Sequence, residues 1–357
     1  MTLLALEVGI RIFYPQDLGF WDSHAFRRVL PTSPHFVENI PNGRAIFTGV
    51  PVSINRDGLR GDEISSPKPP HNTRILVVGD SITFGYGIPI QDTYAKVLER
   101  RLNEAPADNT RYEVLNGGTL GASLSDYLHF LNQKAELLQP DIVLIGLCLN
   151  DILVYSGSGV VLEGSTQWGG RLPRARRFNS WVLRHSQLYA LVYGSLKSTL
   201  YGSGVLDINK VQGLNFVAVQ PASAYQAQAW ASSREMLLRI VAFCRERNYR
   251  LIVAVFPMQM QMSPAEFKFC RERLHLQLGD GALSGEPQRR LQGLAANLGF
   301  TLIDLLPVYR VHSSEDLYLR NKMIPYDPTH PSIRGNQIAA DEIFRALKNQ
   351  MQRARVQ

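Results

Sequence analysis

The chain has 357 residues, of which 45% are hydrophobic, so it can bury at least one full-sized core, and its composition excludes a disordered protein. A net charge of +7 favours anionic partners. Cys148, Cys244 and Cys270 lack any CxxC spacing, which indicates neither a disulfide framework nor a zinc site. We expect Cys148 and Cys244, which lie in apolar runs, to be buried thiols.

The first fourteen residues are mostly apolar, although Glu7 and Arg11 interrupt the run. The run is shorter than the roughly 17 to 25 residues that cross a bilayer, and it lacks the basic start and cleavage site of a signal peptide. We interpret residues 1–14 as an amphipathic first helix or as the distal end of a signal anchor whose start is missing. Residues 15–71 contain many Pro, Gly and Asn residues and are expected to form an irregular lead-in.

From Thr73 onward, short apolar runs alternate with helical patterns, which predicts a parallel sheet with crossover helices. The predicted strands cover residues 74–78, 112–115, 141–145, 250–256 and 300–304, and helices are expected near 94–102, 123–138 and 333–347. Because the strands do not alternate between apolar and polar residues, helices should cover both faces of the sheet. Functional groups then collect at the carboxyl ends of the strands.

Residues 155–225 are expected to form an insertion, with a glycine-rich loop and a helix around 181–200, and they are a candidate lid or partner surface. The densest basic stretch of the chain falls here, beside glycines and a proline that predict an exposed loop. Its arginines are Arg171, Arg174, Arg176 and Arg177. Only Trp168 and Phe178 lie nearby as aromatic residues, so we expect a solvated surface, or attraction to anionic lipid or polysaccharide, and no nucleic-acid partner.

Ser81 directly follows the first predicted strand, in Gly79-Asp80-Ser81. A serine at this position can point its backbone N–H toward a negative charge. Taken alone, the triplet also fits an ordinary cap or turn serine. It is not the nucleophile elbow of the α/β-hydrolases, because that motif needs glycine at the position of Thr83.

A candidate base lies near the end of the chain, in Asp327-Pro328-Thr329-His330-Pro331. The prolines, with Pro325 before them, keep the stretch out of a regular helix, so Asp327 and His330 should share one tight loop. The carboxylate could then hold the imidazole in the tautomer that a general base needs. A competing pair, Asp126 and His129, lies within a helical pattern and is interpreted as ordinary helix residues.

Two further strand ends offer donors for a developing oxyanion. Residues 116–121, from Asn116 to Gly121, follow the second strand, and a glycine backbone can approach a reacting carbonyl closely. Asn150 follows the third strand, and its side-chain amide can donate to the same oxygen. Nucleophile, base, orienting acid and oxyanion donors are the groups that ester hydrolysis needs.

Together, these strand-end segments resemble the four blocks of the SGNH/GDSL hydrolase superfamily, in the order that the superfamily uses. The matching segments are Gly79-Asp80-Ser81, Asn116 to Gly121, Asn150-Asp151 and Asp327-Pro328-Thr329-His330. The resemblance covers about residues 72–348. It implies a flavodoxin-like three-layer α/β/α sandwich with a five-stranded parallel sheet, and no metal or other cofactor.

The resemblance also implies roles for single residues. Ser81 would be the nucleophile, His330 the base and Asp327 its partner. The oxyanion hole would consist of the Ser81 and Gly121 N–H groups and the Asn150 side chain. One position departs from the pattern, because the glycine usually found two residues before the asparagine is Cys148 here.

Residues 53–61 resemble the segment that precedes the hydrolase domain in a bacterial subgroup of this superfamily. Members of that subgroup often carry an amino-terminal membrane anchor, which implies membrane association through residues 1–14. An extracytoplasmic location, in the periplasm or cell envelope, follows from this interpretation. A cytoplasmic location follows if Met1 is the true start.

The sequence therefore predicts a serine esterase or deacetylase that hydrolyses an O-acyl ester, with acetyl as the favoured acyl group and a carbohydrate or small molecule as the alcohol. The alternative is an O-acyltransferase that modifies a cell-envelope or exported polysaccharide, which the lead-in and the insertion motivate. A third hypothesis, a non-catalytic carbohydrate-binding or assembly protein, is favoured only by Cys148.

Overall fold

The protein is described from a computed structural model. It covers residues 2–16, 18, 23–30, 36–104, 110–156, 159–161, 174–202, 224–273, 283–320 and 327–356.

The centre of the molecule is a five-stranded sheet in which all neighbouring strands are parallel. In spatial order its strands are β11 (Thr301–Asp304), β10 (Arg250–Phe256), β7 (Ile142–Cys148), β5 (Asn72–Gly79) and β6 (Arg111–Asn116). The strand order reverses between β5 and β7, so the loops after these two strands flank the switch point where ligands bind in such sheets. The predicted strands and their parallel arrangement are confirmed.

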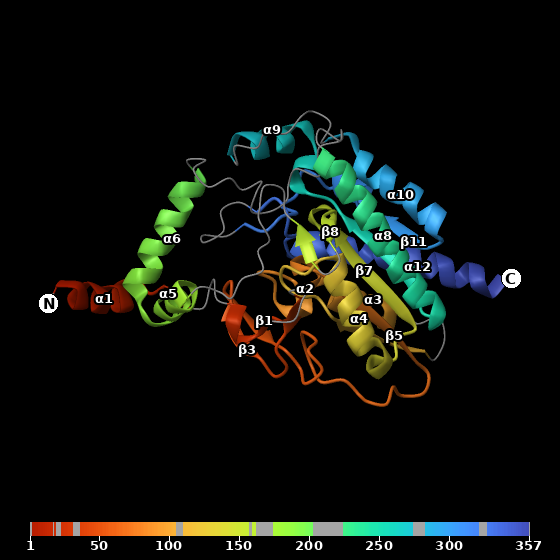
Figure 1. The fold of residues 1–357 in the computed structure, drawn as a ribbon, viewed down its shortest axis with the longest axis horizontal. Helices are drawn as coiled ribbons and strands as arrows, with labels where there is room; N and C mark the ends of the chain where they lie inside the picture. The colour runs from red at the N-terminus through yellow and green to blue at the C-terminus, as the bar shows by residue number, and fades with distance from the viewer. Residues whose placement is uncertain are drawn as a thin grey trace.

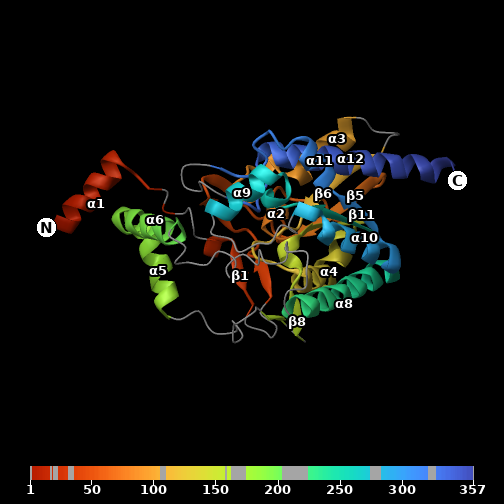
Figure 2. The same cartoon turned by 90° about the horizontal axis from the view of Figure 1, so that it is seen from above.

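Helices cover both faces of the sheet and complete the three layers that the sequence predicts. One layer contains α3 (Tyr94–Glu104), α11 (Leu306–Val311) and α12 (Ile333–Val356), and the other contains α4 (Leu124–Leu138), α8 (Ala224–Glu246) and α10 (Glu286–Leu298). Figure 2 shows the sheet between these two layers. The sequence analysis did not predict α8 and α10. A further helix, α9 (Pro264–Arg273), follows β10.

The core is built by the strands, whose side chains are buried on both faces. Every residue of β7 is buried, and so are residues 74–79 of β5. Cys148 and Cys244 are buried in this core, as predicted, and Cys270 is buried as well. Burial of an unbroken apolar strand from water is the main favourable term that fixes this part of the fold.

The lead-in is more ordered than the sequence suggested, because it contains two antiparallel hairpins. They are formed by β1 (Arg27–Val29) with β2 (Val37–Asn39), and by β3 (Arg44–Phe47) with β4 (Val50–Ser53). Phe26, Phe47 and Val52 of the lead-in bury their side chains against Phe84, in the short helix after β5, and Leu120, in the loop after β6. The turn-rich composition concealed these strands, which are only three or four residues long.

Three helices lie together at the end of the molecule that carries the N-terminus (Figures 1 and 2). They are α1 (Thr2–Phe13), α5 (Arg174–His185) and α6 (Gln187–Gly202). Glu7 of α1 accepts hydrogen bonds from the backbone N–H groups of Gln187 and Leu188, both at 2.9 Å, at the start of α6. None of the helices in the described ranges is long and apolar enough to cross a membrane.

Two expectations for the insertion need correction. The single helix predicted around 181–200 is two helices, because the Ser186 hydroxyl accepts a hydrogen bond from the Tyr189 N–H at 3.0 Å and so caps the start of α6. The basic stretch predicted as a loop is partly helical, since α5 begins at Arg174. Arg171 and the glycine-rich loop before it lie outside the described residues. A short hairpin of β8 (Val154–Ser156) and β9 (Gly159–Val161) opens the insertion.

Candidate active site

Ser81 is held at the carboxyl end of β5, which lies between β7 and β6 in the sheet, as the first residue of the short helix α2 (Ser81–Phe84). Asp80 is the N-cap of this helix, and its carboxylate accepts a hydrogen bond from the Ile82 N–H at 2.8 Å. The chain therefore turns sharply after the strand, which places the Ser81 hydroxyl at the edge of the sheet, where it is only partly buried.

The opposite end of α2 is held by Arg60, a residue of the lead-in that is only 2% exposed. Its guanidinium donates to the carbonyl oxygens of Phe84, Gly85 and Ile88 at 2.5–2.7 Å. A cation at a helix C-terminus satisfies the carbonyl groups that have no partner within the helix. The sequence analysis included Arg60 in a family-like segment but did not assign this role to it.

Asp327 and His330 share one tight loop before α12, as the prolines predicted. Asp327 Oδ1 accepts hydrogen bonds from the backbone N–H groups of Thr329 at 3.0 Å and His330 at 2.9 Å. This arrangement fixes the carboxylate by local backbone contacts and leaves Oδ2 free to face the imidazole.

The side chains of Asp327, His330 and Ser81 form a continuous chain of hydrogen bonds. The His330 Nδ1–H donates to Asp327 Oδ2 at 2.6 Å, and the Ser81 hydroxyl donates to His330 Nε2 at 2.8 Å. Ser81 and His330 are 249 positions apart in the sequence, so only the fold brings them together. The geometry is that of a hydroxyl with an adjacent base whose ring is oriented by a carboxylate.

Nearby charges favour the protonated form of His330. Burial alone would lower its pKa, but the charge and hydrogen bond of Asp327, together with the charge of Asp80, raise the pKa above its ordinary value of 6.5. The imidazole can therefore accept a proton more readily than a free histidine, which is the property that a general base needs.

Tyr86 covers one face of the His330 ring, a contact that the sequence analysis missed. The two rings are stacked with centroids 4.4 Å apart and planes inclined by 26°, and Phe47 of the lead-in packs edge-on against Tyr86 at 5.6 Å. Burial, and then the Asp327 charge, raise the pKa of the Tyr86 hydroxyl, which therefore stays neutral. The lead-in thus reaches the imidazole through one intervening aromatic ring.

The loop from Asn116 to Gly121 passes directly over α2. A Cβ atom on Gly118 would lie 2.1 Å from the Phe84 backbone nitrogen, so only glycine permits this approach. Gly121 has a φ of +68°, in the left-handed region that favours glycine. The atom nearest to a Cβ built on Gly121 is Nη2 of Arg27, at 3.2 Å.

Asn150 lies beside the Asp80–Ser81 segment, in the 3-10 turn Leu149–Asp151 that follows β7. Its Nδ2 donates a long hydrogen bond of 3.5 Å to Asp80 Oδ2, and its buried Oδ1 has no hydrogen-bond partner among the described residues. The preceding residue that departs from the family pattern, Cys148, has an extended backbone with φ −101° and ψ 153°. Any residue can adopt that conformation, so the absence of glycine there does not distort the turn.

The buried carboxyl of Asp151 holds the backbone of the turn that carries Asn150. Asp151 Oδ2 accepts hydrogen bonds from the Tyr127 hydroxyl and from the Cys148 N–H, both at 3.0 Å. Burial, and then the charge of Asp80, raise the pKa of Asp151 well above its ordinary value. Burial raises the pKa of Asp80 too. Two such carboxyls close together favour a protonated form for one of them.

The competing pair, Asp126 and His129, lies on α4 as predicted and has a structural role. Asp126 accepts a hydrogen bond from the Ser123 N–H at 2.9 Å, and the Ser123 side chain accepts one from the Asp126 N–H, which together form a capping box at the start of the helix. The Ser123 hydroxyl also lies 2.8 Å from the Asp126 carboxylate. His129 stacks on Phe36 of the lead-in with ring centroids 4.0 Å apart. The interpretation of both as ordinary helix residues is confirmed.

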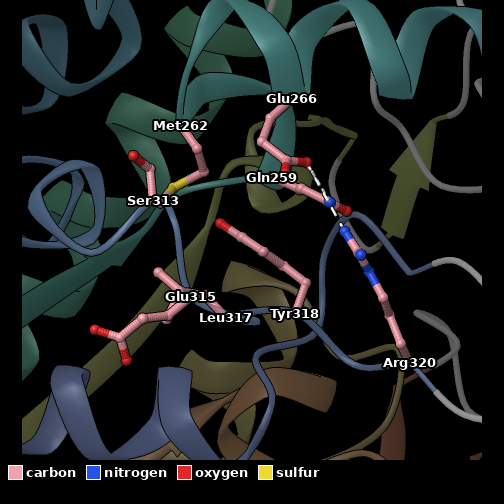
Figure 3. A pocket seen from close by; sticks show the side chains of 8 residues that line it. All are labelled: Gln259, Met262, Glu266, Ser313, Glu315, Leu317, Tyr318 and Arg320. Atoms are coloured by element: carbon pink, nitrogen blue, oxygen red, sulfur yellow. Dashed lines mark hydrogen bonds and ion pairs between the residues drawn. The ribbon is translucent and has the colours of Figure 1, made fainter.

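A pocket, whose lining side chains are drawn in Figure 3, adjoins the loop that carries Asp327 and His330 (the base loop). One wall is formed by Gln259, whose side chain donates to Glu266 at 2.5 Å and whose backbone N–H donates to the Pro328 carbonyl at 2.8 Å. Tyr318 points into the pocket and donates its hydroxyl proton to the Pro257 carbonyl at 2.8 Å. These contacts fasten the base loop to the end of β10, and no member of the Asp327–His330–Ser81 chain lines the pocket.

Comparisons with known proteins identify the family of this chain. The model of the GDSL-like lipase/acylhydrolase family matches residues 77–338. An arylesterase from Vibrio mimicus is 37% identical over 78 residues, a stretch that covers 22% of this chain and 38% of that protein. The match thus spans less than half of the length of the arylesterase.

Among solved structures, a catalytic mutant of an acetylxylan esterase from Geobacillus stearothermophilus shares 15% identity, with a TM-score of 0.42 over 76% of this chain and 93% of that chain. A psychrotrophic esterase from Pseudoalteromonas sp. shares 13% identity, with a TM-score of 0.39 over 78% and 99% of the two chains. Because the family model covers most of the chain and includes the strand ends described above, the chain belongs to the GDSL-like lipase/acylhydrolase family of carboxylic ester hydrolases.

Proposed function

We propose that this protein is a serine esterase that removes an O-acyl group, with acetyl as the favoured acyl group and a carbohydrate as the candidate alcohol, through an acyl-Ser81 intermediate. The observation that carries the proposal is the chain of hydrogen bonds at 2.6 and 2.8 Å that joins Asp327, His330 and Ser81. The arylesterase and acetylxylan esterase relatives add support for an ester substrate.

In the first half of the reaction, Ser81 Oγ attacks the carbonyl carbon of the ester while His330 Nε2 takes the hydroxyl proton. Asp327 stabilises the imidazolium that forms. When the tetrahedral intermediate collapses, the bond to the alcohol oxygen breaks and His330 gives its proton to that oxygen. The alcohol leaves, and the acyl group stays on Ser81.

Water completes the cycle. It attacks the acyl carbon and loses a proton to His330 Nε2, and the bond to Ser81 Oγ then breaks as the imidazolium returns its proton to the serine. The products are a carboxylic acid and the free enzyme. Asp327 acts in both halves by holding Nδ1 protonated, so that Nε2 is always the nitrogen that exchanges the proton.

The developing oxyanion needs donors that are already in place. We assign this role to the Ser81 N–H, the Gly121 N–H and the Asn150 side-chain amide. The contact of Asn150 with Asp80 supports the assignment, because it brings the amide to the segment that carries the nucleophile. The left-handed backbone of Gly121 and the close passage of its loop over α2 support the second donor.

The direct test is the Ser81→Ala variant with 4-nitrophenyl acetate as substrate. We expect kcat/KM to fall by roughly four orders of magnitude. In a triad of this kind, removal of one residue removes most of the rate enhancement that all three provide together. Ser53→Ala, an exposed serine at the end of β4, is the matched control and should keep full activity. A fluorophosphonate probe should add its mass to the wild type at Ser81 only, and hydrolysis that survives in Ser81→Ala would refute the proposal.

Transfer of the acyl group to a sugar hydroxyl is the alternative use of the same intermediate. Mass spectrometry of an added glycan, incubated with enzyme and 4-nitrophenyl acetate, separates the two outcomes. We expect acetate as the main product. An acetylated glycan formed faster than acetate would assign the protein as an acyltransferase instead.

We also propose that α1 associates with a membrane surface in the cell envelope. Leu3, Leu4 and Phe13 of this helix are 72%, 69% and 83% exposed, and Trp181 of the nearby α5 is 56% exposed. Apolar side chains that gather on helices at one end of a molecule are typical of a protein or lipid contact. The net charge of +7 favours an anionic surface.

A further inference from the structure

We propose that Arg27 binds an anionic group of the substrate beside the acyl site, which makes the enzyme selective for esters that carry a carboxylate or a similar anion. The inference rests on the proposed function and extends it to a substrate class. Arg27 belongs to β1 of the lead-in, a segment outside the residues matched by the family model.

The position of Arg27 is set by the loop that carries Gly121. Its Nε donates to the Leu120 carbonyl at 2.5 Å, and its Nη2 lies 3.2 Å from the place that a Gly121 Cβ would occupy. The guanidinium therefore lies beside the residue that we assign as an oxyanion donor. One edge of the group is anchored to the loop, and this contact leaves the other N–H groups for a further partner.

The charge of Arg27 has no carboxylate partner at ion-pair distance in the described part of the chain. The charge that favours it most is Asp126, but that carboxylate is occupied by the Val37 N–H and by the N–H and hydroxyl of Ser123. Burial lowers the pKa of Arg27, and the Asp126 charge only partly offsets this effect. An arginine nevertheless stays protonated in proteins.

The Arg27 guanidinium is partly buried and has no counter-ion among the described residues, so an anionic ligand would supply a favourable charge that the protein does not. Its planar fork matches a carboxylate with two parallel hydrogen bonds. The neighbouring Arg28 differs in this respect, because it pairs with Glu38 and its side chain is 56% exposed. Of these two adjacent arginines, only Arg27 lies beside Gly121, and only Arg27 has no carboxylate partner among the described residues. An anion site requires both properties.

The test compares two matched pairs of esters, so that the position of the anion is also resolved. In the first pair, 4-acetoxybenzoate and its methyl ester, the charge is on the alcohol part. In the second pair, 4-nitrophenyl hydrogen adipate and 4-nitrophenyl methyl adipate, the charge is on the acyl part. The readout is the ratio of kcat/KM for the acid to kcat/KM for its methyl ester, which cancels general losses of activity.

In at least one pair, Arg27→Gln should lower this ratio by about tenfold or more, mainly through KM, because a charge-assisted hydrogen bond is lost. Arg27→Lys should keep part of the ratio. Arg28→Gln makes the same change in charge one residue away and should leave the ratio unaltered. For the wild type, the ratio should fall as NaCl is added, a result that needs no variant to fold.

Equal losses on acid and methyl ester in both pairs would show that Arg27 only braces the loop, and would overturn the inference. A wild-type ratio that does not respond to NaCl would do the same. Either result would leave the proposed esterase function intact, provided that the methyl esters are still hydrolysed in a Ser81-dependent way. Loss of that Ser81-dependence would instead refute the proposed function.

Discussion

At the scale of single residues, the site combines the partly buried hydroxyl of Ser81 with buried carboxyl groups. His330 is in contact with Asp327 and lies in the field of Asp80, and both carboxylates raise its pKa against the effect of burial. Asp80 also caps α2 and contacts Asn150, so one side chain links the proposed nucleophile, base and oxyanion donor.

The pH dependence of kcat/KM should report the titration of His330. The protonated imidazole cannot accept the Ser81 proton, so activity should fall as the pH is lowered, with a midpoint above 6.5. Asp80→Asn keeps a side-chain oxygen for the Ile82 N–H but removes a negative charge, which makes the imidazolium less stable and moves the midpoint to lower pH. The measurement is a pH profile with a neutral ester.

Asp62→Asn is the control for that shift, because Asp62 is an exposed aspartate of the lead-in. It should leave the midpoint where it is in the wild type. A midpoint in Asp80→Asn equal to or higher than that of the wild type would show that the Asp80 charge does not act on His330.

At the scale of elements, the lead-in packs against the hydrolase domain and supports the residues around the candidate site. Its hairpins pack on Phe84 and Leu120, its Phe47 supports Tyr86, and its Arg60 holds the end of α2. The short helix α2 has four residues and cannot be stable alone. Its stability comes from the burial of Ile82 and Phe84 and from Asp80 and Arg60, which satisfy backbone groups at its two ends.

Removal of Arg60 should therefore unfold the protein more easily. In Arg60→Met three buried carbonyl groups lose their donor, which should lower the free energy of unfolding by about 3 kcal/mol or more. Urea unfolding followed by circular dichroism gives the measurement. Arg56→Met is the matched control, since the Arg56 side chain is 59% exposed in ion pairs with Asp57 and Glu63, and it should cost less than about 1 kcal/mol. Equal midpoints for the two variants would contradict this role of Arg60.

At the scale of the whole molecule, the proposed catalytic groups and the α1–α5–α6 helices occupy different regions. The hydrolase layers form the body, and the three helices lie at the end that carries the N-terminus (Figure 1). Such a separation would let one end rest on a membrane while the site stays open to a substrate in water.

Co-sedimentation with vesicles of phosphatidylglycerol and phosphatidylcholine tests this arrangement. The Leu3→Glu/Leu4→Glu double variant should bind at least about tenfold more weakly, because two apolar side chains can no longer enter the lipid. Leu137→Glu, a 50% exposed leucine on α4 in the body, should bind like the wild type. Hydrolysis of a water-soluble ester should be the same in all three proteins. Wild-type protein that stays in the supernatant would disprove membrane association.

The sequence by itself determined the parallel sheet, because unbroken apolar runs of strand length are a local signal that needs no knowledge of distant residues. It also determined the tight loop of Asp327 and His330, since proline geometry acts over a few neighbouring positions. The roles proposed for Ser81 and His330 came from motif resemblance, which identifies the residues without any measured distance.

Only the tertiary structure decided which side chains surround these groups. Tyr86 lies on His330, Arg60 holds α2, and Arg27 lies against Gly121, and each of these contacts joins segments that are far apart in the chain. Periodicity and turn chemistry describe a residue and its neighbours within a few positions, whereas a contact between distant segments depends on how whole layers pack. For that reason the lead-in looked irregular in sequence, although in the folded molecule it forms one wall of the candidate active site.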